Sequence, residues 1–134
     1  MTSLTISSTC PDAALSAAVA EHCAGWRHVP SGDRDTGNGL MAFPEFWRRE
    51  DGSGDVFEID ELPPFATSVD ECLPILETYP SYRMLRVDTV GESKWMVEID
   101  AKNLWGLIFR ANGPTAARTL CYALLKSKGF EVTP

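Results

Sequence analysis

Two strand-like segments, residues 82–90 and 94–100, constrain the fold of this chain more than any other feature. In the second segment Trp95, Val97 and Ile99 alternate with more polar residues. A period of two places alternate side chains on opposite faces of a sheet, one face buried and the other wetter. A short turn separates the segments, so the pattern predicts an antiparallel hairpin.

The segments after this hairpin predict a third strand and a closing helix. Residues 104–111 are mostly apolar and read as the third strand of a meander. Residues 114–129 have a helical period, with Arg118, Lys126 and Lys128 expected to face outward. The apolar stripe of this helix comprises Ala117, Leu120, Cys121, Leu124 and Leu125. A helix with one apolar stripe buries it against another element, so the helix is expected to pack on the meander.

Two further helices are predicted. Pro11 is tolerated at a helix start, and Gly25 is well placed to end that helix. Ser68 with Glu71 fits the capping box of a second helix. Pro74 removes a backbone donor from this helix and should bend or shorten it.

Between these two helices the chain predicts irregular β structure. Residues 26–29 form a candidate short strand, and residues 30–40 read as a loop because they are rich in Gly, Asp, Asn and Ser. A hairpin is expected between residues 41–49 and 56–59. The fold class is therefore α+β, an α-β-α sandwich with helices packed on a mostly antiparallel sheet. We expect a single domain over residues 1–134, with 1–9 disordered and 10–129 forming the sandwich.

Four segments together resemble the phage ABA sandwich, a family of small bacteriophage and prophage domains. The resemblance covers most of residues 12–129 and implies a phage origin and an α-β-α layering. Pro74 and the loops within 30–60 depart from the family pattern. The four segments are Ala-Gly-Trp at 24–26, LPPFATSVDECLPILE at 62–77, KWMVEI at 94–99, and PTAARTLCYALLKSKG at 114–129.

The charge balance excludes several classes of partner. The formal net charge is -7, which disfavours direct binding to nucleic acid or to an anionic membrane. Residues 101–134 form a basic segment in which Glu131 is the one acid. We expect this segment to pair with the acidic residues of 1–100 within the fold, and the alternative is that it binds a partner of its own. The first residues lack a signal peptide, so the expected location is the cytoplasm of a bacterial host, with reduced thiols.

The sequence offers no catalytic motif, metal site or cofactor site. Its nearest approach to a metal cluster comprises Cys10, His22, Cys23 and His28, which lack zinc-ligand spacing. Cys72 and Cys121 lie on apolar helix faces, where a thiolate nucleophile is disfavoured. Buried small hydrophobes explain these cysteines better. We therefore expect no enzymatic activity, no metal and no cofactor.

An acidic stretch is the candidate partner-binding surface. Complementary charge would let it bind a basic protein surface and exclude the normal ligand of that surface. The predicted function is a phage accessory protein that inhibits a host nucleic-acid-binding defence complex, as an anti-CRISPR does. The alternatives are a nucleotide-binding sponge or sensor, a phage assembly or housekeeping protein, and a hydrolase with an unrecognised site. A sheet edge could also support a homodimer. The candidate residues are Glu50, Asp51, Asp55, Glu58, Asp60 and Glu61.

Overall fold

Three helices form the centre of the molecule. The computed structural model describes residues 4–30, 32–35, 37, 39–50, 52, 54–58, 61–89, 92–100 and 108–133. The helices are α1 (Asp12–His22), α2 (Val69–Leu76) and α3 (Ala116–Ser127). Both α1 and α2 pack against α3, whose central residues are fully buried. The apolar stripe of the last helix therefore organises the core, as its sequence period predicts.

The predicted meander is confirmed as a three-stranded antiparallel sheet. Its strands are β7 (Ser81–Thr89), β8 (Glu92–Asp100) and β9 (Ile108–Gly113), in the order β7-β8-β9. Val97 and Ile99 are fully buried, so the alternating pattern identifies the face that packs on α3. The α+β class, with helices packed on a mostly antiparallel sheet, is thus confirmed. The third strand was predicted from 104, but residues 101–107 lie outside the described part of the chain.

A second antiparallel sheet comprises β2 (Trp26–Val29), β5 (Phe46–Arg49) and β6 (Asp55–Val56). The predicted strand at 26–29 is present in this sheet. The predicted hairpin between the 41–49 and 56–59 segments is present in part: residues 47–48 pair with 55–56, residues 41–43 belong to another strand, and Ile59 lies outside the described residues. The aromatic side chains of Trp26 and Trp47 are buried in the core.

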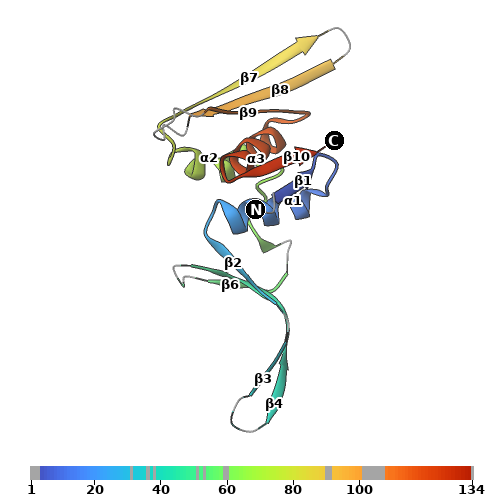
Figure 1. Cartoon of the computed structure of the whole chain (residues 1–134), viewed down its shortest axis with the longest axis vertical. Coiled ribbons are helices and arrows are strands. Elements are labelled where there is room, and N and C mark those ends of the chain that lie inside the picture. Colours follow the sequence, from blue (N-terminus) through green and yellow to red (C-terminus); the bar gives the residue numbers. More distant parts are fainter. Residues whose placement is uncertain are drawn as a thin grey trace.

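The predicted loop at 30–40 is wrong. Strands β3 (Gly32–Asp35) and β4 (Leu40–Phe43) pair in antiparallel register there. Glycine and aspartate disfavour strands only weakly. Pairing of the flanking strands β2 and β5 brings the two segments that form β3 and β4 side by side. The resulting hairpin projects away from the helices (Figure 1).

The predicted disorder of residues 1–9 is also wrong for the described residues. Strand β1 (Leu4–Ser7) runs parallel to β10 (Phe130–Thr133), with Ile6 opposite Val132. Both of these side chains pack against the core. Parallel partners at opposite ends of the chain leave no local signal, which explains why neither strand was predicted.

The helix ends agree with most of the sequence signals. Ser68 is the N-cap of α2, but its hydroxyl makes no cap hydrogen bond, so the predicted capping box is wrong. Thr115 caps α3 by accepting the backbone N–H of Arg118 at 3.3 Å. Pro74 lies inside α2, which ends two residues later, as the missing backbone donor predicts. Gly129, with φ +94°, follows the end of α3.

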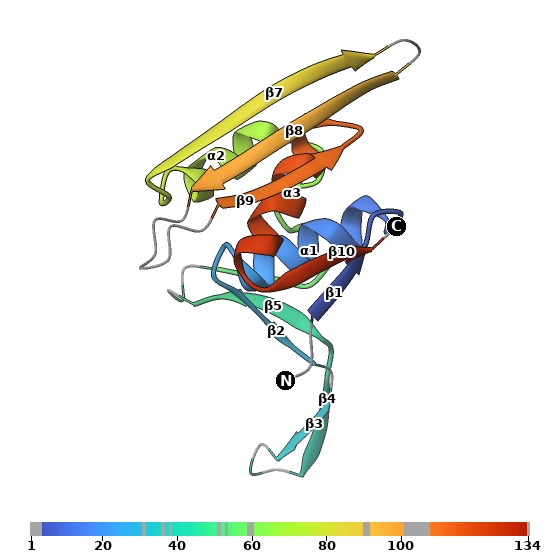
Figure 2. The ribbon, with the colours of Figure 1, turned by 45° about the horizontal axis from the view of Figure 1, so that its top comes forward.

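The layers run sheet, helices, sheet, which differs from the α-β-α order that the family resemblance implies. Figures 1 and 2 show the helices between the β7-β8-β9 sheet and the β2-β5-β6 sheet, with the β1-β10 pair beside α1. Within the described chain, no helix covers the outer face of β7-β8-β9, and the β7-β8 hairpin extends beyond the helices (Figure 2). The molecule therefore has two open sheet surfaces on opposite sides of its core.

Candidate binding surface

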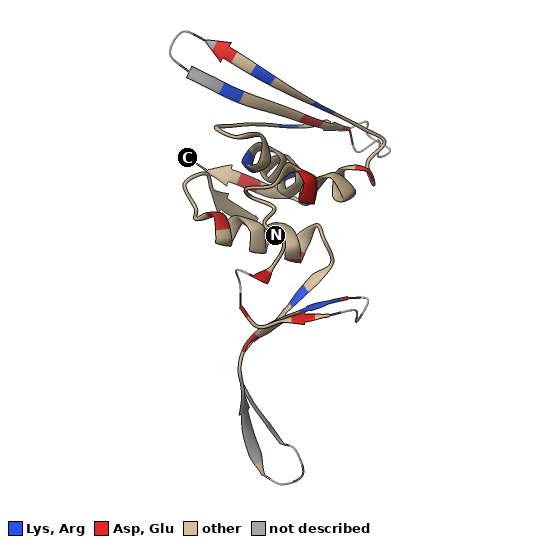
Figure 3. Ribbon diagram, turned by 180° about the vertical axis from the view of Figure 1, so that it is seen from behind, with Lys and Arg blue, Asp and Glu red and all other residues tan. Residues whose placement is uncertain are grey.

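The six acids predicted to bind a partner are interleaved with basic residues. Figure 3 shows basic and acidic positions close together in the β2-β5-β6 sheet, with the basic ones on β2 and β5 and an acidic one on β6. Asp51 and Asp60 lie outside the described residues. The remaining four are all exposed to solvent: Glu50, Asp55, Glu58 and Glu61. These four acids thus lie around the β2-β5-β6 sheet, Glu50 at the Gly25 end of β5 and Glu58 and Glu61 at the turn by Phe57, whose ring packs on Phe46.

Asp55 is neutralised within the molecule. It lies opposite Arg48 in the β5-β6 ladder and accepts two hydrogen bonds from that guanidinium, Nε–Oδ1 at 2.9 Å and Nη2–Oδ2 at 3.2 Å. This two-bond contact lowers the pKa of Asp55 and raises the pKa of Arg48. Asp55 therefore adds less negative charge to the surface than the sequence suggests.

The arginines of this surface were missed by sequence reasoning. Arg27 lies directly opposite Arg48 on β2 and β5, an arrangement that is destabilising unless the charges are offset. The Arg49 guanidinium carbon lies 5.3 Å from the Trp26 ring centroid. A pocket of about 200 Å³ beside these strands is lined by Arg27, Arg48, Arg49, Glu50 and Gly52. Burial does not alternate along β2 or β5, so the sequence pattern offered no signal for this placement.

Phe57 is the apolar centre of the surface. Its side chain is 58% exposed, although phenylalanine is usually buried. The ring lies 5.8 Å from the ring of Phe46, which the Arg48 guanidinium covers from 5.0 Å. The Glu61 carboxylate accepts the backbone N–H of Phe57 at 3.2 Å and that of Glu58 at 3.4 Å. These bonds hold the turn in which Phe57 is exposed.

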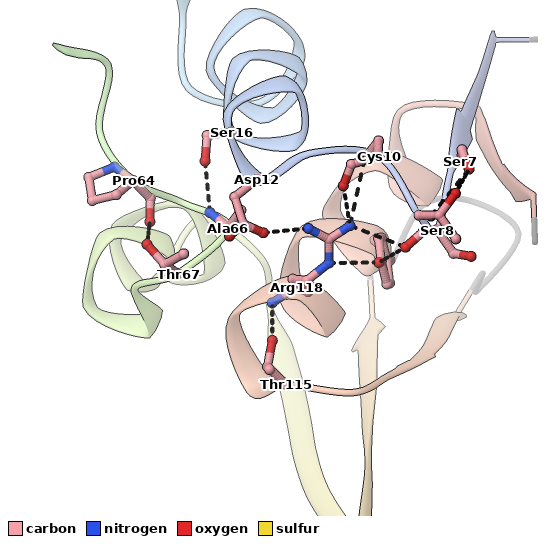
Figure 4. Close-up of polar contacts among 12 residues, drawn as sticks. Ser7, Ser8, Cys10, Asp12, Ser16, Pro64, Ala66, Thr67, Thr115 and Arg118 are labelled. Carbon is pink, nitrogen blue, oxygen red and sulfur yellow. Dashed lines mark hydrogen bonds and ion pairs between the residues drawn. The ribbon is translucent and has the colours of Figure 1, made fainter. Parts of the chain in front are cut away.

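Arg118 joins α3 to the N-terminal segment (Figure 4). Its guanidinium donates to the Asp12 carboxylate at 2.5 Å, to the Tyr122 hydroxyl at 3.0 Å, and to the carbonyls of Ser8 and Cys10 at 3.2 and 2.9 Å. The side chain is only 13% exposed, so the prediction that it faces outward is wrong. The predicted pairing of basic C-terminal residues with the acidic body is confirmed here and in the contact of Arg110 with Glu98.

A pocket of about 410 Å³ lies beside this contact. The first residues of all three helices line it, namely Asp12, Val69 and Ala116. Thr67 and Thr115 add hydroxyl groups. Helix N-termini carry partial positive charge, but the adjacent Arg118 charge is already paired with Asp12.

The candidate zinc and nucleophile residues take structural positions. The His22 ring packs on Phe130 with centroids 4.7 Å apart, and His28 Nε2 lies 3.0 Å from Glu45. Burial raises the pKa of the Cys23 thiol to about 12. The hydrogen bond with Cys72, together with burial, raises the pKa of the Cys121 thiol. In the part of the chain that is described, no three His, Cys, Asp or Glu side chains are grouped to hold a metal ion.

None of the described helices combines the length and apolar character needed to cross a lipid bilayer. No known family model, curated protein or solved structure matches the chain.

Proposed function

We propose that the protein acts by binding another protein through the acidic β surface, defined here as Glu50, Asp55, Phe57, Glu58 and Glu61. The observation that carries this proposal is the exposed Phe57 ring, in a turn whose backbone N–H groups at Phe57 and Glu58 donate to the Glu61 carboxylate. Protein interfaces have an apolar, often aromatic centre and a polar rim, and a few central residues supply most of the binding energy. Phe57 fits the centre of such an interface.

The charges favour a basic partner. Glu50, Glu58 and Glu61 make no ion pair with any described Lys or Arg, whereas Asp55 does. These carboxylates and the net charge of -7 would attract a basic surface and speed its association. The sharpest form of the proposal is a phage accessory protein that covers the nucleic-acid-binding surface of a host defence complex. The neighbouring Arg27 and Arg49 would then meet acidic groups of the same partner and fix its orientation.

The test compares two charge-matched variants. The first is the triple substitution E50K/E58K/E61K, and the second is E21K/E77K/E131K, which reverses three exposed carboxylates elsewhere. Each protein is used to capture partners from a bacterial lysate at low and high salt. A captured protein is then purified, its affinity is measured directly, and nucleic acid is added as a competitor.

We expect the first variant to lose binding and the second to retain it. Phe57→Ala should weaken binding by at least about tenfold, because truncating a central aromatic residue costs roughly 2 kcal/mol or more. Added nucleic acid should displace the partner. Equal binding by both triple variants, or no specific partner at any salt concentration, would count against the proposal.

Binding of a nucleotide or similar small molecule is a second candidate. The pocket of about 410 Å³ at the starts of α1, α2 and α3 favours it, since ligand pockets measure roughly 300–1,000 Å³. A bound ligand stabilises the folded state by mass action. Thermal-shift screening with nucleotides and cyclic nucleotides should then raise the melting temperature, and the absence of any shift at millimolar concentrations would remove this candidate.

A further inference from the structure

Strand β7 is an open edge with little support from the rest of the protein. Its nine residues pair with β8 on one side, and no described strand lies on the other. From Ser81 to Asp88 every side chain except Met84 is exposed, so both faces of this strand meet solvent. An isolated two-stranded hairpin is marginally stable in water, and long open edges are usually covered or protected by charge. The length and exposure of β7 indicate a missing neighbour.

Three of the exposed side chains of β7 are large and apolar, and they alternate with charged ones. Tyr82, Leu85 and Val87 are 42%, 39% and 43% exposed. Leu85 and Val87 lie two positions apart and so share one face of the sheet. This is the outer face, because Leu85 pairs with Met96 and the adjacent Val97 is buried against the helices. Burial of such side chains is the main favourable term in association.

We propose that β7 pairs with β7 of a second copy of this chain, antiparallel and centred on Leu85. In this register Leu85 lies opposite the partner's Leu85, and all nine residues of each strand are paired. An antiparallel pair of identical strands has a two-fold axis perpendicular to the sheet. The outer faces of both copies therefore lie on the same side of the combined sheet. The two three-stranded sheets then form one continuous sheet.

The sequence of β7 complements itself in this register. Tyr82 lies opposite the partner's Asp88, so its hydroxyl can donate to a carboxylate. Arg83 lies opposite the partner's Val87, and Met84 opposite the partner's Arg86, so the alkyl part of each arginine covers an apolar side chain. No two like charges face each other within this register. Self-complementarity of this kind favours a second copy over an unrelated strand.

The oligomeric state tests the inference. Light scattering coupled to gel filtration, from about 1 to about 200 µM protein, should show a concentration-dependent dimer. Leu85→Lys places two lysines face to face on the two-fold axis and should weaken the dimer by at least about 100-fold, since opposed like charges cost several kcal/mol. Ile108→Lys is the matched control, because Ile108 is exposed on the outer face of the opposite edge strand. Circular dichroism checks that both variants are folded.

A disulfide tests the register. Residues opposite each other in antiparallel strands lie about 4.5–5.5 Å apart at Cα, within the range of a disulfide. Under mild oxidation Leu85→Cys should give a covalent dimer, whereas Val87→Cys and the wild type should not. A monomer at every concentration, a dimer that survives Leu85→Lys, or equal loss with Ile108→Lys would overturn the proposal. Binding at the acidic β surface is measured separately, so failure here does not affect that function.

Discussion

Replacing Arg118 with alanine should destabilise the fold more than the loss of any exposed arginine. The guanidinium bridges α3 to the N-terminal segment through the Asp12 carboxylate, the Tyr122 hydroxyl and the carbonyls of Ser8 and Cys10. Alanine removes all of these donors at once. The Ser8 carbonyl keeps one bond, from the Tyr122 hydroxyl at 3.0 Å, but the Cys10 carbonyl loses its side-chain donor.

The magnitude follows from these contacts. A hydrogen bond from a charged donor contributes about 1.5–3 kcal/mol, and a buried acceptor left unsatisfied costs about 1–3 kcal/mol. Water can replace the donor at Asp12, which is 58% exposed, so that contact counts for little. The expected loss is therefore about 2–4 kcal/mol. For a protein of this size that corresponds to a fall in melting temperature of roughly 10 °C.

Urea unfolding followed by circular dichroism measures this loss. Arg118→Lys keeps the charge but not the planar fork, so it should recover only part of the stability. Arg110→Ala is the control: its side chain is 62% exposed, and its loss should matter much less. If Arg118→Ala is no less stable than Arg110→Ala, the reasoning about the bridging contact is refuted.

Three further predictions concern acid, packing and thiol chemistry. The hydrogen bond with Arg110 lowers the pKa of Glu98 in the folded protein. The ionised Glu98 therefore stabilises the folded state fully above the unfolded pKa of about 4.3, and this stabilisation is lost as the pH falls through the lower pKa of the folded protein. The difference in urea midpoint between wild type and Glu98→Gln should shrink from about pH 6 to about pH 3, and a constant difference would contradict this. A Cβ at Gly113 would lie 2.6 Å from the Thr119 Oγ1. Gly113→Ala should therefore lower the free energy of unfolding by about 1–3 kcal/mol, and by less when it is combined with Thr119→Ala. Strictly additive effects in this double-mutant cycle would contradict the clash. Burial raises the pKa of the Cys23 thiol to about 12. Iodoacetamide at about pH 8 should therefore leave Cys23 unmodified in the folded protein and label it in urea, as measured by peptide mass spectrometry. Fast labelling of Cys23 in the native protein would contradict this.

Local periodicity predicted the parts of the fold whose partners lie nearby in sequence. The alternation of Trp95, Val97 and Ile99 identified the buried face of β8, and the apolar stripe identified α3. Periodicity states which side of an element is buried but not what covers it. Pairing between β1 and β10 is non-local, and the β3-β4 hairpin follows from its flanking strands, so neither left a readable pattern.

The candidate site was predicted only in its position along the chain. A run of acids marks a charged segment, but its net effect depends on the side chains across the sheet. Arg48 neutralises Asp55 from the neighbouring strand, and Arg27 lies one strand farther. Arg118 shows the opposite error, since a cation on a helix was expected in solvent and instead lies among backbone carbonyls. Strand register decides such pairings, and register was not available from composition.

The pairing of β1 with β10 has a consequence for how this protein is made. Residues 4–7 are synthesised before their parallel partner at 130–133. Strand β1 must therefore wait for its partner until β10 has emerged from the ribosome. Contacts of such long sequence separation slow folding, because loop closure precedes any gain from pairing. Closure of this fold thus follows the synthesis of β10.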